Sequence, residues 1–577
     1  MRILGLSIDV PTCTSAALIR DGVVTVGSPE ERLNREKWSS KFPSKAIQYC
    51  LSAEGIEIGD LGGIAVSWNP LINLTESSSA RLISAGRHKG ELLYSVPVNL
   101  LQLTNSSVTS DEHLYLKQTI AFEHSDIDIY YIRHHACHAA HSFFESPFDE
   151  AVILTCDGYG ENETITVSIG EKNSIKRVST TYFPHSIGMF YGTITEYLGY
   201  RHDSDEWKVM ALGAFGRFDK SLYKKLYDLF SVQDDLSIKM DSNAFQFNNM
   251  LKKGMFDGTF EDYIGISPRT REGDYSMEHY NLAYAAQKVF EDILFELISK
   301  ISQKFKTRNI CLGGGSFMNS LFNGKLAHSN IFENIYIPFA PSDAGCAIGA
   351  ASHLYYHIMG HERKIDPSGG NPYLGPTYSD DKIEKVLKLF KCNYTKPNNL
   401  LSDVAKLIAE GSVVGWFQGQ MEFGDRALGN RSILADPRNP ESKDKVNAVI
   451  KFREAYRPFA PSILSEHVKE YFDIPESNAC APYMEKVFNV RKDKVSKIPS
   501  VVHADGTGRL QSVDRQRNAK YYELIEAFYK LTDIPILLNT SLNRNGEPVV
   551  CSPEDALNVF YGSGLDCLVL NNYVVRK

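Results

Sequence analysis

Short apolar runs at the start of the chain predict a β-hairpin. Ile3–Ile8 and Ala16–Ile19 have the length and composition of strands. The dipeptide Asp21-Gly22, a strong turn signal, comes just before a further apolar run, Val23–Val26. Apolar runs joined by such a dipeptide are typical of antiparallel strands. We therefore expect the chain to begin with a hairpin.

Further along, apolar patterns of strand length and helix length alternate. Ala151–Thr155, Asn309–Leu312 and Ile335–Pro338 are short and apolar, as strands are. Asn281–Ser302 has helical periodicity, and Ala344–Tyr355 is rich in alanine and glycine and is also expected to be helical. This mixture predicts an α/β fold.

A change in composition divides the chain into two parts. His361–Thr377 carries closely spaced proline, glycine and aspartate turn signals, which are typical of a linker. Helical periodicity resumes at Asp380–Leu389, and a second α/β unit begins firmly with the apolar run Ser412–Phe417. We expect a first domain over residues 1–360, a linker over 361–379 and a second domain over 380–577.

The composition is that of a globular protein with more than one core. The chain has 577 residues, of which 43% are hydrophobic and 23% are charged, and chains of this length usually divide into domains. The net charge of −8 argues against nucleic acid or an anionic membrane as a partner. No apolar run is long enough to span a membrane.

The cysteine pattern points to a reducing compartment. The ten cysteines are scattered and form no C-x-x-C pair, so we expect neither a disulfide framework nor a thiolate zinc site. The first residues also lack the basic start and long apolar stretch of a signal peptide. We therefore expect a cytoplasmic protein.

A cluster of histidines in Arg133–His141 is the first candidate for chemistry. If the segment is helical, His134 and His138 are four residues apart and share one face, with His141 on the next turn. His135 points about 100° away round the helix. Two imidazoles at this spacing can bind one metal ion.

Two aspartates follow predicted strands and could complete such a metal site. Asp157 comes after Ala151–Thr155, and Asp343 comes after Ile335–Pro338. The ends of strands that face a crevice are where α/β proteins place functional groups. Two histidines and two aspartates would form a neutral site around a divalent ion. The alternative is that the histidines are core or surface residues and that the aspartates, Asp343 in particular, cap helices.

Glycine-rich segments offer possible contacts to a nucleotide. Gly313-Gly314-Gly315 follows a predicted strand and would let backbone N–H groups approach a phosphate or a sugar. A tight structural turn is the alternative, because the run is neither a Walker A motif nor a Rossmann fingerprint. Lys208, shortly before the glycine-rich stretch 213–216, could meet a phosphate or could be solvated.

Basic residues of the second part suggest a pocket for a small anion. Arginines bind phosphate through a bidentate fork, and hydroxyl and amide groups can complete the shell. The alternative is a solvated charged face. The residues concerned are Arg426, Arg431, Lys451, Arg453, Arg457, Arg509 and the segment Asn539-Thr540-Ser541.

Several of these segments carry a family resemblance. In the second part they are Phe417–Gly424, Asp425–Arg438, Ile450–Pro461, His503–Arg509 and Leu537–Asn543. In the first part they are Ser15-Ala16-Ala17, Glu30-Glu31-Arg32, the pair His134 and His138, and Asp157-Gly158. Together they resemble the nodulation-protein-U and cephem O-carbamoyltransferase family over nearly the whole chain.

The resemblance implies a fold and a reaction. The first domain should resemble the Kae-type threonylcarbamoyl-transfer proteins, with an actin/sugar-kinase-like (ASKHA) fold, and the second should be a YrdC-like α/β domain. The YrdC-like domain would make carbamoyl adenylate from carbamoyl phosphate and ATP. The intermediate would pass inside the protein to the Kae-like domain. There a divalent metal, iron in the relatives, would hold it while a hydroxyl of a natural product or sugar takes the carbamoyl group, releasing AMP and pyrophosphate.

The resemblance also assigns residues to these roles. It implies the metal ligands His134, His138, Asp157 and Asp343. The carbamoyl phosphate and ATP site matches Arg426, Arg431, Lys451, Arg457, Arg509, Asn539 and Ser541. The adenylate cradle matches Gly313, Gly314 and Gly315, with Asn319 beside them. Direct catalytic roles would fall to His134, His138, Asp157, Lys451 and Arg457, and Mg²⁺ could accompany ATP.

Two positions depart from the family pattern. Thr12 stands where a histidine that could handle the proton is expected, so the base for the hydroxyl would come from elsewhere, from the metal site or from phosphate. Asp425 replaces a usual proline and puts a carboxylate beside Arg426. Two other functions stay open: a threonylcarbamoyl-type enzyme acting on tRNA and a nucleotide-sensing ASKHA protein. A homodimer is also compatible with the sequence.

Overall fold

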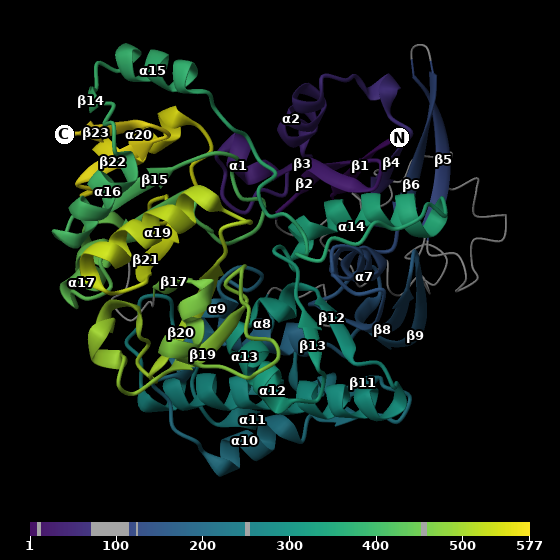
Figure 1. Cartoon of the computed structure of the whole chain (residues 1–577). Coiled ribbons are helices and arrows are strands. Elements are labelled where there is room, and N and C mark those ends of the chain that lie inside the picture. Colours follow the sequence, from purple (N-terminus) through teal and green to yellow (C-terminus); the bar gives the residue numbers. More distant parts are fainter. Residues whose placement is uncertain (9–12, 71–114, 123–124, 248–253, 452–458) are drawn as a thin grey trace. The chain divides into compact units, whose positions relative to one another are not determined.

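A computed structural model describes residues 1–8, 13–70, 115–122, 125–247, 254–451 and 459–577 (Figure 1). These residues form two units. The first consists of Met1–Val26, Ser40–Met318 and Ile331–Gly370, and the second of Gly27–Ser39, Asn319–Asn330 and Asn371–Lys577. The last crossing between units falls inside the segment 361–379 that the sequence suggests as a linker. The division differs from a single cut, because the second unit also takes in two earlier segments.

The first sheet of the first unit begins with the predicted hairpin, which the structure confirms. Its strands have the order β3-β2-β1-β4-β6-β5. Strand β1 pairs antiparallel with β2 and parallel with β4, and β4 pairs parallel with β6. The strands are β1 (Arg2–Ser7), β2 (Ser15–Arg20), β3 (Val23–Pro29), β4 (Gly63–Val66), β5 (Tyr115–Phe122) and β6 (Ser125–Ile132).

The second sheet of this unit repeats the topology of the first. Its order is β13-β12-β7-β8-β9, with β9, β8 and β7 antiparallel and β7, β12 and β13 parallel. Strands β3-β2-β1-β4-β6 have the same order and directions. This duplication agrees with the predicted α/β, actin/sugar-kinase-like fold. The strands are β7 (Glu150–Cys156), β8 (Glu163–Glu171), β9 (Ser174–Tyr182), β12 (Asn309–Gly313) and β13 (Asn334–Tyr336).

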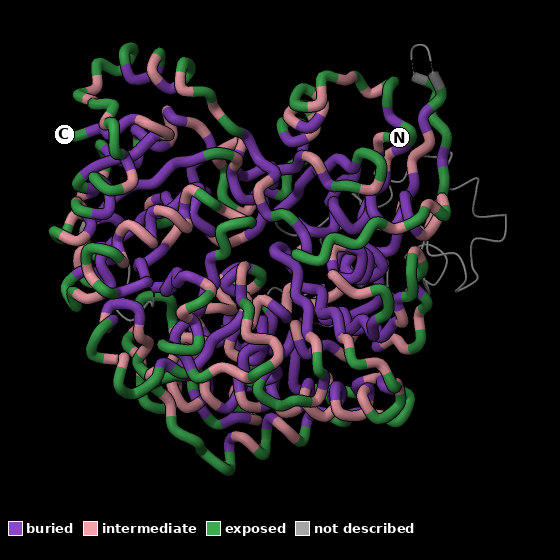
Figure 2. Tube along the Cα trace, viewed as in Figure 1, coloured by how far each residue is buried: buried purple, intermediate pink, exposed green. Residues whose placement is uncertain are grey.

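Two helices of the first unit matter most for the candidate site. Helix α7 (His134–Phe144) is buried along its whole length (Figure 2). Helix α14 (Cys346–Ser352) packs against α7 and β1. The contact is close, because a Cβ atom on Gly349 would collide with the carbonyl of Cys137. The two helices therefore hold each other in a fixed register.

The predicted helix Ala344–Tyr355 is divided into three pieces. A 3₁₀ turn, η4 (Asp343–Gly345), precedes α14, and a π-helical segment, η5 (His353–Ile358), follows it. The helix is thus wound more tightly at its start, in the 3₁₀ turn, and more loosely at its end, in the π-helical segment. Alanine and glycine content predicts a helix but not these changes of winding.

The predicted helix Asn281–Ser302 lies inside α12 (Met277–Lys304). The other elements of the first unit are α2 (Ser44–Glu54), η1 (Ile58–Asp60), α8 (Ile187–Tyr197), α9 (Glu206–Gly213), α10 (Lys220–Tyr227), the pair β10 (Phe230–Val232) and β11 (Ile238–Met240), η2 (Ser242–Ala244), α11 (Gly258–Ile264) and η3 (Gly315–Met318).

The second unit is built on a ten-stranded sheet with the order β14-β23-β22-β15-β16-β21-β17-β20-β19-β18. Its strands are β14 (Asn393–Thr395), β15 (Val414–Phe417), β16 (Arg431–Ala435), β17 (Ala460–Leu464), β18 (Phe472–Asp473), β19 (Lys486–Val490), β20 (Thr507–Val513), β21 (Ile536–Ser541), β22 (Cys567–Leu570) and β23 (Tyr573–Arg576).

Helices pack along this sheet. Helices α16 and α19 contact each other, and α20 contacts β15 and β22 (Figure 1). The helices are α1 (Glu30–Asn34), α13 (Ser320–Ser329), α15 (Asp380–Leu389), α16 (Leu400–Ala409), α17 (Glu441–Lys445), η6 (Val446–Lys451), η7 (Ser465–His467), α18 (Val468–Tyr471), η8 (Val495–Lys497), η9 (Pro499–Val501), α19 (Ala519–Thr532) and α20 (Pro553–Tyr561). Helix α15 has the predicted bounds. Among the described residues, no helix combines the length and apolar character needed to cross a membrane.

Candidate active site

The two histidines predicted to share a helix face do so at the start of α7. Their Nε2 atoms lie 3.0 Å apart, and each side chain is 1% exposed. The backbone N–H of His134 donates to the carboxylate of Glu161 at 3.1 Å and 3.2 Å, which anchors the first turn. Two ring nitrogens this close must share either a proton or a cation.

Both predicted carboxylates reach the same point. Asp157, just after β7, places Oδ2 2.9 Å from Nε2 of His138 and 3.6 Å from Nε2 of His134. Asp343, at the start of η4, places Oδ1 3.5 Å from both Nε2 atoms. The aspartate side chains are 17% and 19% exposed. The cluster is therefore closed on the histidine side and open to solvent on the carboxylate side.

This arrangement fits a divalent cation. The four ligand atoms all lie within 4.8 Å of one another. Atoms bound about 2.1 Å from a common ion are roughly 3.0–3.5 Å apart at ordinary coordination angles, close to the separations found here. Asp343 does not cap a helix, as the alternative supposed. Ser342 is the N-cap of η4, and Gly345 is the N-cap of α14. Two imidazoles and two carboxylates suit iron, manganese or zinc.

The charges within the cluster are strongly coupled. Burial disfavours the charged imidazole of His138, but Cys346 and the aspartates outweigh it and hold its pKa well above the ordinary value. The pKa of His134 is raised for the same reasons. Burial also opposes ionisation of Asp157, yet the two histidines hold its pKa well below the ordinary value. The cluster thus favours a positive charge at its centre, which a proton or a metal ion can supply.

Cys346 is a member of this neighbourhood that sequence reasoning missed. Its side chain is fully buried, and its Sγ atom lies within 4.8 Å of a ring nitrogen of both His134 and His138. Burial raises the pKa of a thiol, but the two histidines reverse the effect and lower that of Cys346. Its position three residues after Asp343, at the start of a helix, was the available signal.

The other two histidines of α7 are core residues. His135 Nδ1 contacts Oγ1 of Thr155 at 2.8 Å, and the ring of His141 packs edge-on against Phe339. Burial lowers the pKa of both imidazoles to about 3. Both are therefore neutral at ordinary pH and lie outside the cluster of four ligands.

The glycine run at the end of β12 serves close packing at two of its three positions. A Cβ atom on Gly313 would crowd the carbonyl of His138, and one on Gly314, whose φ is 99°, would collide with the carbonyl of Cys156. At Gly315 a Cβ atom would lie 3.1 Å from Oδ1 of Asp157. Gly315 is thus the position that borders the cluster, and the tight-turn alternative describes the other two.

Two further predicted phosphate or nucleotide contacts have local partners. Lys208 lies 3.0 Å from Asp205 and over the ring of Tyr200. Asn319 is the N-cap of α13 in the second unit and accepts a hydrogen bond from the backbone N–H of Phe322. Each of these contacts gives the side chain a structural role.

In the second unit, the loop between β15 and β16 presents Arg426. Oε1 of Glu422, which is 1% exposed, accepts hydrogen bonds from the backbone N–H groups of Leu428, Asn430 and Arg431 at 2.7, 2.8 and 3.2 Å. Sequence reasoning did not single out Glu422. Arg426 is partly buried and makes no hydrogen bond with a described residue, and burial lowers its pKa while Asp425 opposes the shift. An unpaired, partly buried guanidinium is suited to an anion.

Arg431 and Asn539 instead hold this loop in place. Nη1 and Nη2 of Arg431, which is fully buried, donate to main-chain carbonyls including those of Gln418 at 2.6 Å and Pro376 at 3.0 Å. The Asn539 amide donates to the carbonyl of Ala427 at 3.1 Å. The structure therefore brings these two residues near the predicted site as supports.

The remaining predicted anion ligands are only partly described. Ser541 donates to Oδ1 of Asn543 at 2.6 Å, and Arg509 lies on β20. Arg453 and Arg457 lie outside the residues that the structure describes, as do Thr12 and the side chain of Lys451.

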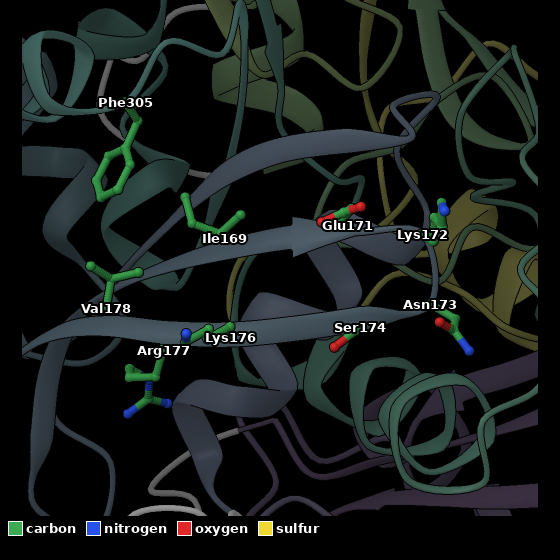
Figure 3. A pocket seen from close by; sticks show the side chains of 9 residues that line it. All are labelled: Ile169, Glu171, Lys172, Asn173, Ser174, Lys176, Arg177, Val178 and Phe305. Carbon is green, nitrogen blue, oxygen red and sulfur yellow. The ribbon is translucent and has the colours of Figure 1, made fainter.

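A depression of about 780 Å³ lies elsewhere in the first unit. Figure 3 shows that it is formed by the β8–β9 hairpin and Phe305, with Lys172, Lys176 and Arg177 among its charged residues. Arg177 is engaged by the buried carboxylate of Glu163. The depression contains none of the predicted site residues.

Comparison with known proteins agrees with the predicted family. Residues 2–352 match the family model for the carbamoyltransferase N-terminus, and residues 405–577 match that for the carbamoyltransferase C-terminus. Nodulation protein NolNO of Sinorhizobium fredii is 36% identical over 99% of this chain and 80% of its own length. The uncharacterized protein sll1178 of Synechocystis is 34% identical over 98% of this chain and 95% of its own length.

Likeness to solved structures is distant. Component A of (R)-2-hydroxyglutaryl-CoA dehydratase from Acidaminococcus fermentans covers 62% of this chain and 98% of its own, with 12% identity and a TM-score of 0.34. The family models together span most of the sequence and confirm the resemblance carried by its motifs. This chain therefore belongs to the carbamoyltransferase family.

Proposed function

We propose that the protein is an ATP-dependent O-carbamoyltransferase with two sites. The second unit makes carbamoyl adenylate from carbamoyl phosphate and ATP. The first unit transfers the carbamoyl group to the hydroxyl of a small molecule, such as a sugar or another natural product. One observation carries the proposal: in a carbamoyltransferase chain, four side chains from α7, from the residue after β7 and from η4 have ligand atoms within 4.8 Å of one another.

The donor set supports transfer at this cluster. His134, His138, Asp157 and Asp343 would hold the divalent cation, which would supply positive charge against a phosphate or carbonyl oxygen. Among the described side chains of the cluster, the carboxylates are the ones exposed to solvent, so the substrate would approach from their side. Gly315 leaves this side free of a Cβ atom beside Asp157.

Activation is assigned to the second unit. Arg426 supports this assignment because it is unpaired among the described residues and stands on a loop fixed by Glu422 and Asn539. Arg509, Ser541, Lys451 and Arg457 complete the proposed anion site. Arg431 is assigned to holding the loop, since its donors face carbonyls of the protein.

The two-step chemistry has a simple reason. A carbamoyl group is a poor electrophile, and adenylation gives it a good leaving group. Water takes up the phosphoryl group of carbamoyl phosphate, so inorganic phosphate leaves. The oxygen of the resulting carbamate displaces pyrophosphate from ATP. The acceptor hydroxyl then attacks the carbamoyl carbon, loses its proton and displaces AMP.

The test is product formation with a panel of acceptors. Purified protein, a divalent metal, ATP and carbamoyl phosphate are incubated with sugars, aminoglycosides and other alcohols, and the products are analysed by mass spectrometry. The proposal expects an acceptor that gains one carbamoyl group together with AMP, and no product when carbamoyl phosphate is omitted. ATP turnover that ignores carbamoyl phosphate, or tight and salt-sensitive tRNA binding in a filter assay, would contradict it.

A further inference from the structure

The pair His134 and His138 belongs to two groups of metal-binding side chains. One group adds the oxygens of Asp157 and Asp343, and the other adds the sulfur of Cys346. Within the part of the chain that the structure describes, the Cys346 sulfur shares this 4.8 Å neighbourhood with the two histidines and with neither carboxylate. The sulfur and the carboxylates therefore lie in different directions from the shared nitrogens.

The fold fixes the sulfur in this position. Cys346 is the first residue of α14, and α14 is pressed against α7 where Gly349 meets the carbonyl of Cys137. One residue before Cys346, a Cβ atom on Gly345 would collide with the ring of His141. The N-terminal end of α14 therefore cannot withdraw from α7 without opening a close-packed contact.

The two groups cannot be satisfied by one ion in the same place. Ligands on opposite sides of a zinc ion are at most about 4.4 Å apart for one sulfur and one oxygen bond. The Cys346 sulfur and the carboxylate oxygens are farther apart than 4.8 Å, which is more than this span. An ion bound through the sulfur must therefore lie away from the carboxylates.

We propose that the histidine pair serves two mutually exclusive coordination sets, and that a soft divalent cation of the zinc or cadmium class binds on the Cys346 side. An ion on that side occupies the nitrogens that a harder ion on the carboxylate side needs. Bound thiolate favours soft cations, whereas carboxylates favour harder ones such as manganese. Binding on the sulfur side releases the thiol proton. The inference rests on the side chains themselves and goes beyond the proposed transfer reaction.

Cadmium provides a direct probe, because a Cd²⁺–thiolate bond gives a charge-transfer absorption in the near ultraviolet. Every protein tested carries Cys480→Ser and Cys392→Ser, because the thiols of these exposed and half-buried cysteines would also bind Cd²⁺. In this background the full-length protein is titrated with Cd²⁺ without further change (the wild type of this test) and as Cys346→Ser, the double variant Asp157→Asn with Asp343→Asn, and Cys50→Ser. Cys50 is a matched control, since it is equally buried but lies in α2. The absorption is expected in wild type, in Cys50→Ser and in the double variant, and it should be absent from Cys346→Ser.

Competition tests whether the sets exclude each other. Free Mn²⁺ is followed by electron paramagnetic resonance while Cd²⁺ is added. In wild type Cd²⁺ should release bound Mn²⁺ one for one, and Cys346→Ser should need at least about tenfold more Cd²⁺, because it lacks the soft ligand.

Absence of the cadmium absorption from both wild type and the double variant would overturn the inference, as would its persistence in Cys346→Ser. Joint binding of Mn²⁺ and Cd²⁺ would overturn the exclusion. Failure of the proposed transfer site is a separate result: wild type would then bind no Mn²⁺ but still show the cadmium absorption.

Discussion

Single residues around α7 show how burial sets protonation in the first unit. Glu163 is fully buried, and although burial raises the pKa of a carboxyl, Arg177, His135 and Arg133 lower that of Glu163 to about 2. Glu145, the C-cap of α7, has no such full compensation, and burial raises its pKa to about 7 against the opposing effect of Arg363. The folded state therefore prefers Glu145 to be protonated.

Replacing Glu145 with glutamine should change how stability depends on pH. The folded pKa of about 7 lies above the ordinary value of 4.5 for a glutamate, so the contribution of Glu145 to stability is greatest below about pH 4.5 and is lost as the pH rises through about 7. Over that window the wild type should lose up to about 1.4 kcal/mol per pH unit relative to Glu145→Gln. Melting temperatures of both proteins between pH 5 and 8 measure this difference.

The exposed Glu171 offers a matched control. Glu171→Gln should melt in parallel with the wild type over this range. A constant difference between wild type and Glu145→Gln would show that Glu145 is already ionised in the folded protein.

Sequence spacing was enough to predict some residues of the candidate site. The four-residue spacing of His134 and His138, and the placement of Asp157 after a strand, predict directions that follow from helix and strand geometry. Glu422 could not be found in this way, because its role comes from the path of a loop. Cys346 offered only its position three residues after Asp343, since its place beside the histidines comes from helix packing. Arg431 is a similar case. An arginine suits phosphate, but the surroundings of Arg431 supply main-chain carbonyls that accept its hydrogen bonds.

At the scale of elements, the loop between β15 and β16 depends on one buried carboxylate. Three backbone N–H groups of the loop point at Oε1 of Glu422. Without that acceptor they would be buried donors lacking partners, which cost about 1–3 kcal/mol each. Glu422 is thus a positioning residue for the loop that carries Arg426.

Glu422→Ala should loosen this loop, whereas Glu422→Gln should largely preserve it, because the amide oxygen can still accept hydrogen bonds. Hydrogen exchange of peptides covering residues 424–431, followed by mass spectrometry, should be faster in Glu422→Ala than in Glu422→Gln. The KM for carbamoyl phosphate should rise in the same order. Glu523→Ala, which removes a glutamate with a 41% exposed side chain, is the control and should match the wild type. Equal exchange in all variants would show that Glu422 does not position the loop.

Elements whose apolar residues recur with a clear period were predicted well. The helix that changes from 3₁₀ to α to π winding was not. The opening hairpin and α15 follow directly from turn signals and helical periodicity. The division of Ala344–Tyr355 into η4, α14 and η5 depends on neighbouring elements. Gly345 lies against the ring of His141, and Gly349 lies against the carbonyl of Cys137. Local composition carries no information about those contacts.

At the scale of the whole molecule, the first unit repeats one strand order in two sheets. No repeat is visible in the sequence, because many sequences satisfy the same order of strands and only the apolar pattern is constrained. The membership of Gly27–Ser39 and Asn319–Asn330 in the second unit is hidden for a similar reason. Both segments are fixed by tertiary contacts, such as those of α13 with β19.

Pyrophosphate release distinguishes activation from transfer most directly, because the proposed function assigns the two steps to separate sites. Carbamoyl phosphate-dependent pyrophosphate release from ATP and carbamoylation of an acceptor are measured for wild type, Arg426→Ala, His138→Ala and the exposed control Arg491→Ala, whose side chain is 54% exposed. Arg426→Ala should lower pyrophosphate release by about 10- to 100-fold, the cost of losing a charge-assisted contact. His138→Ala should release pyrophosphate at the wild-type rate and form no carbamoylated product. Loss of both reactions in His138→Ala, or unchanged pyrophosphate release in Arg426→Ala, would contradict the account.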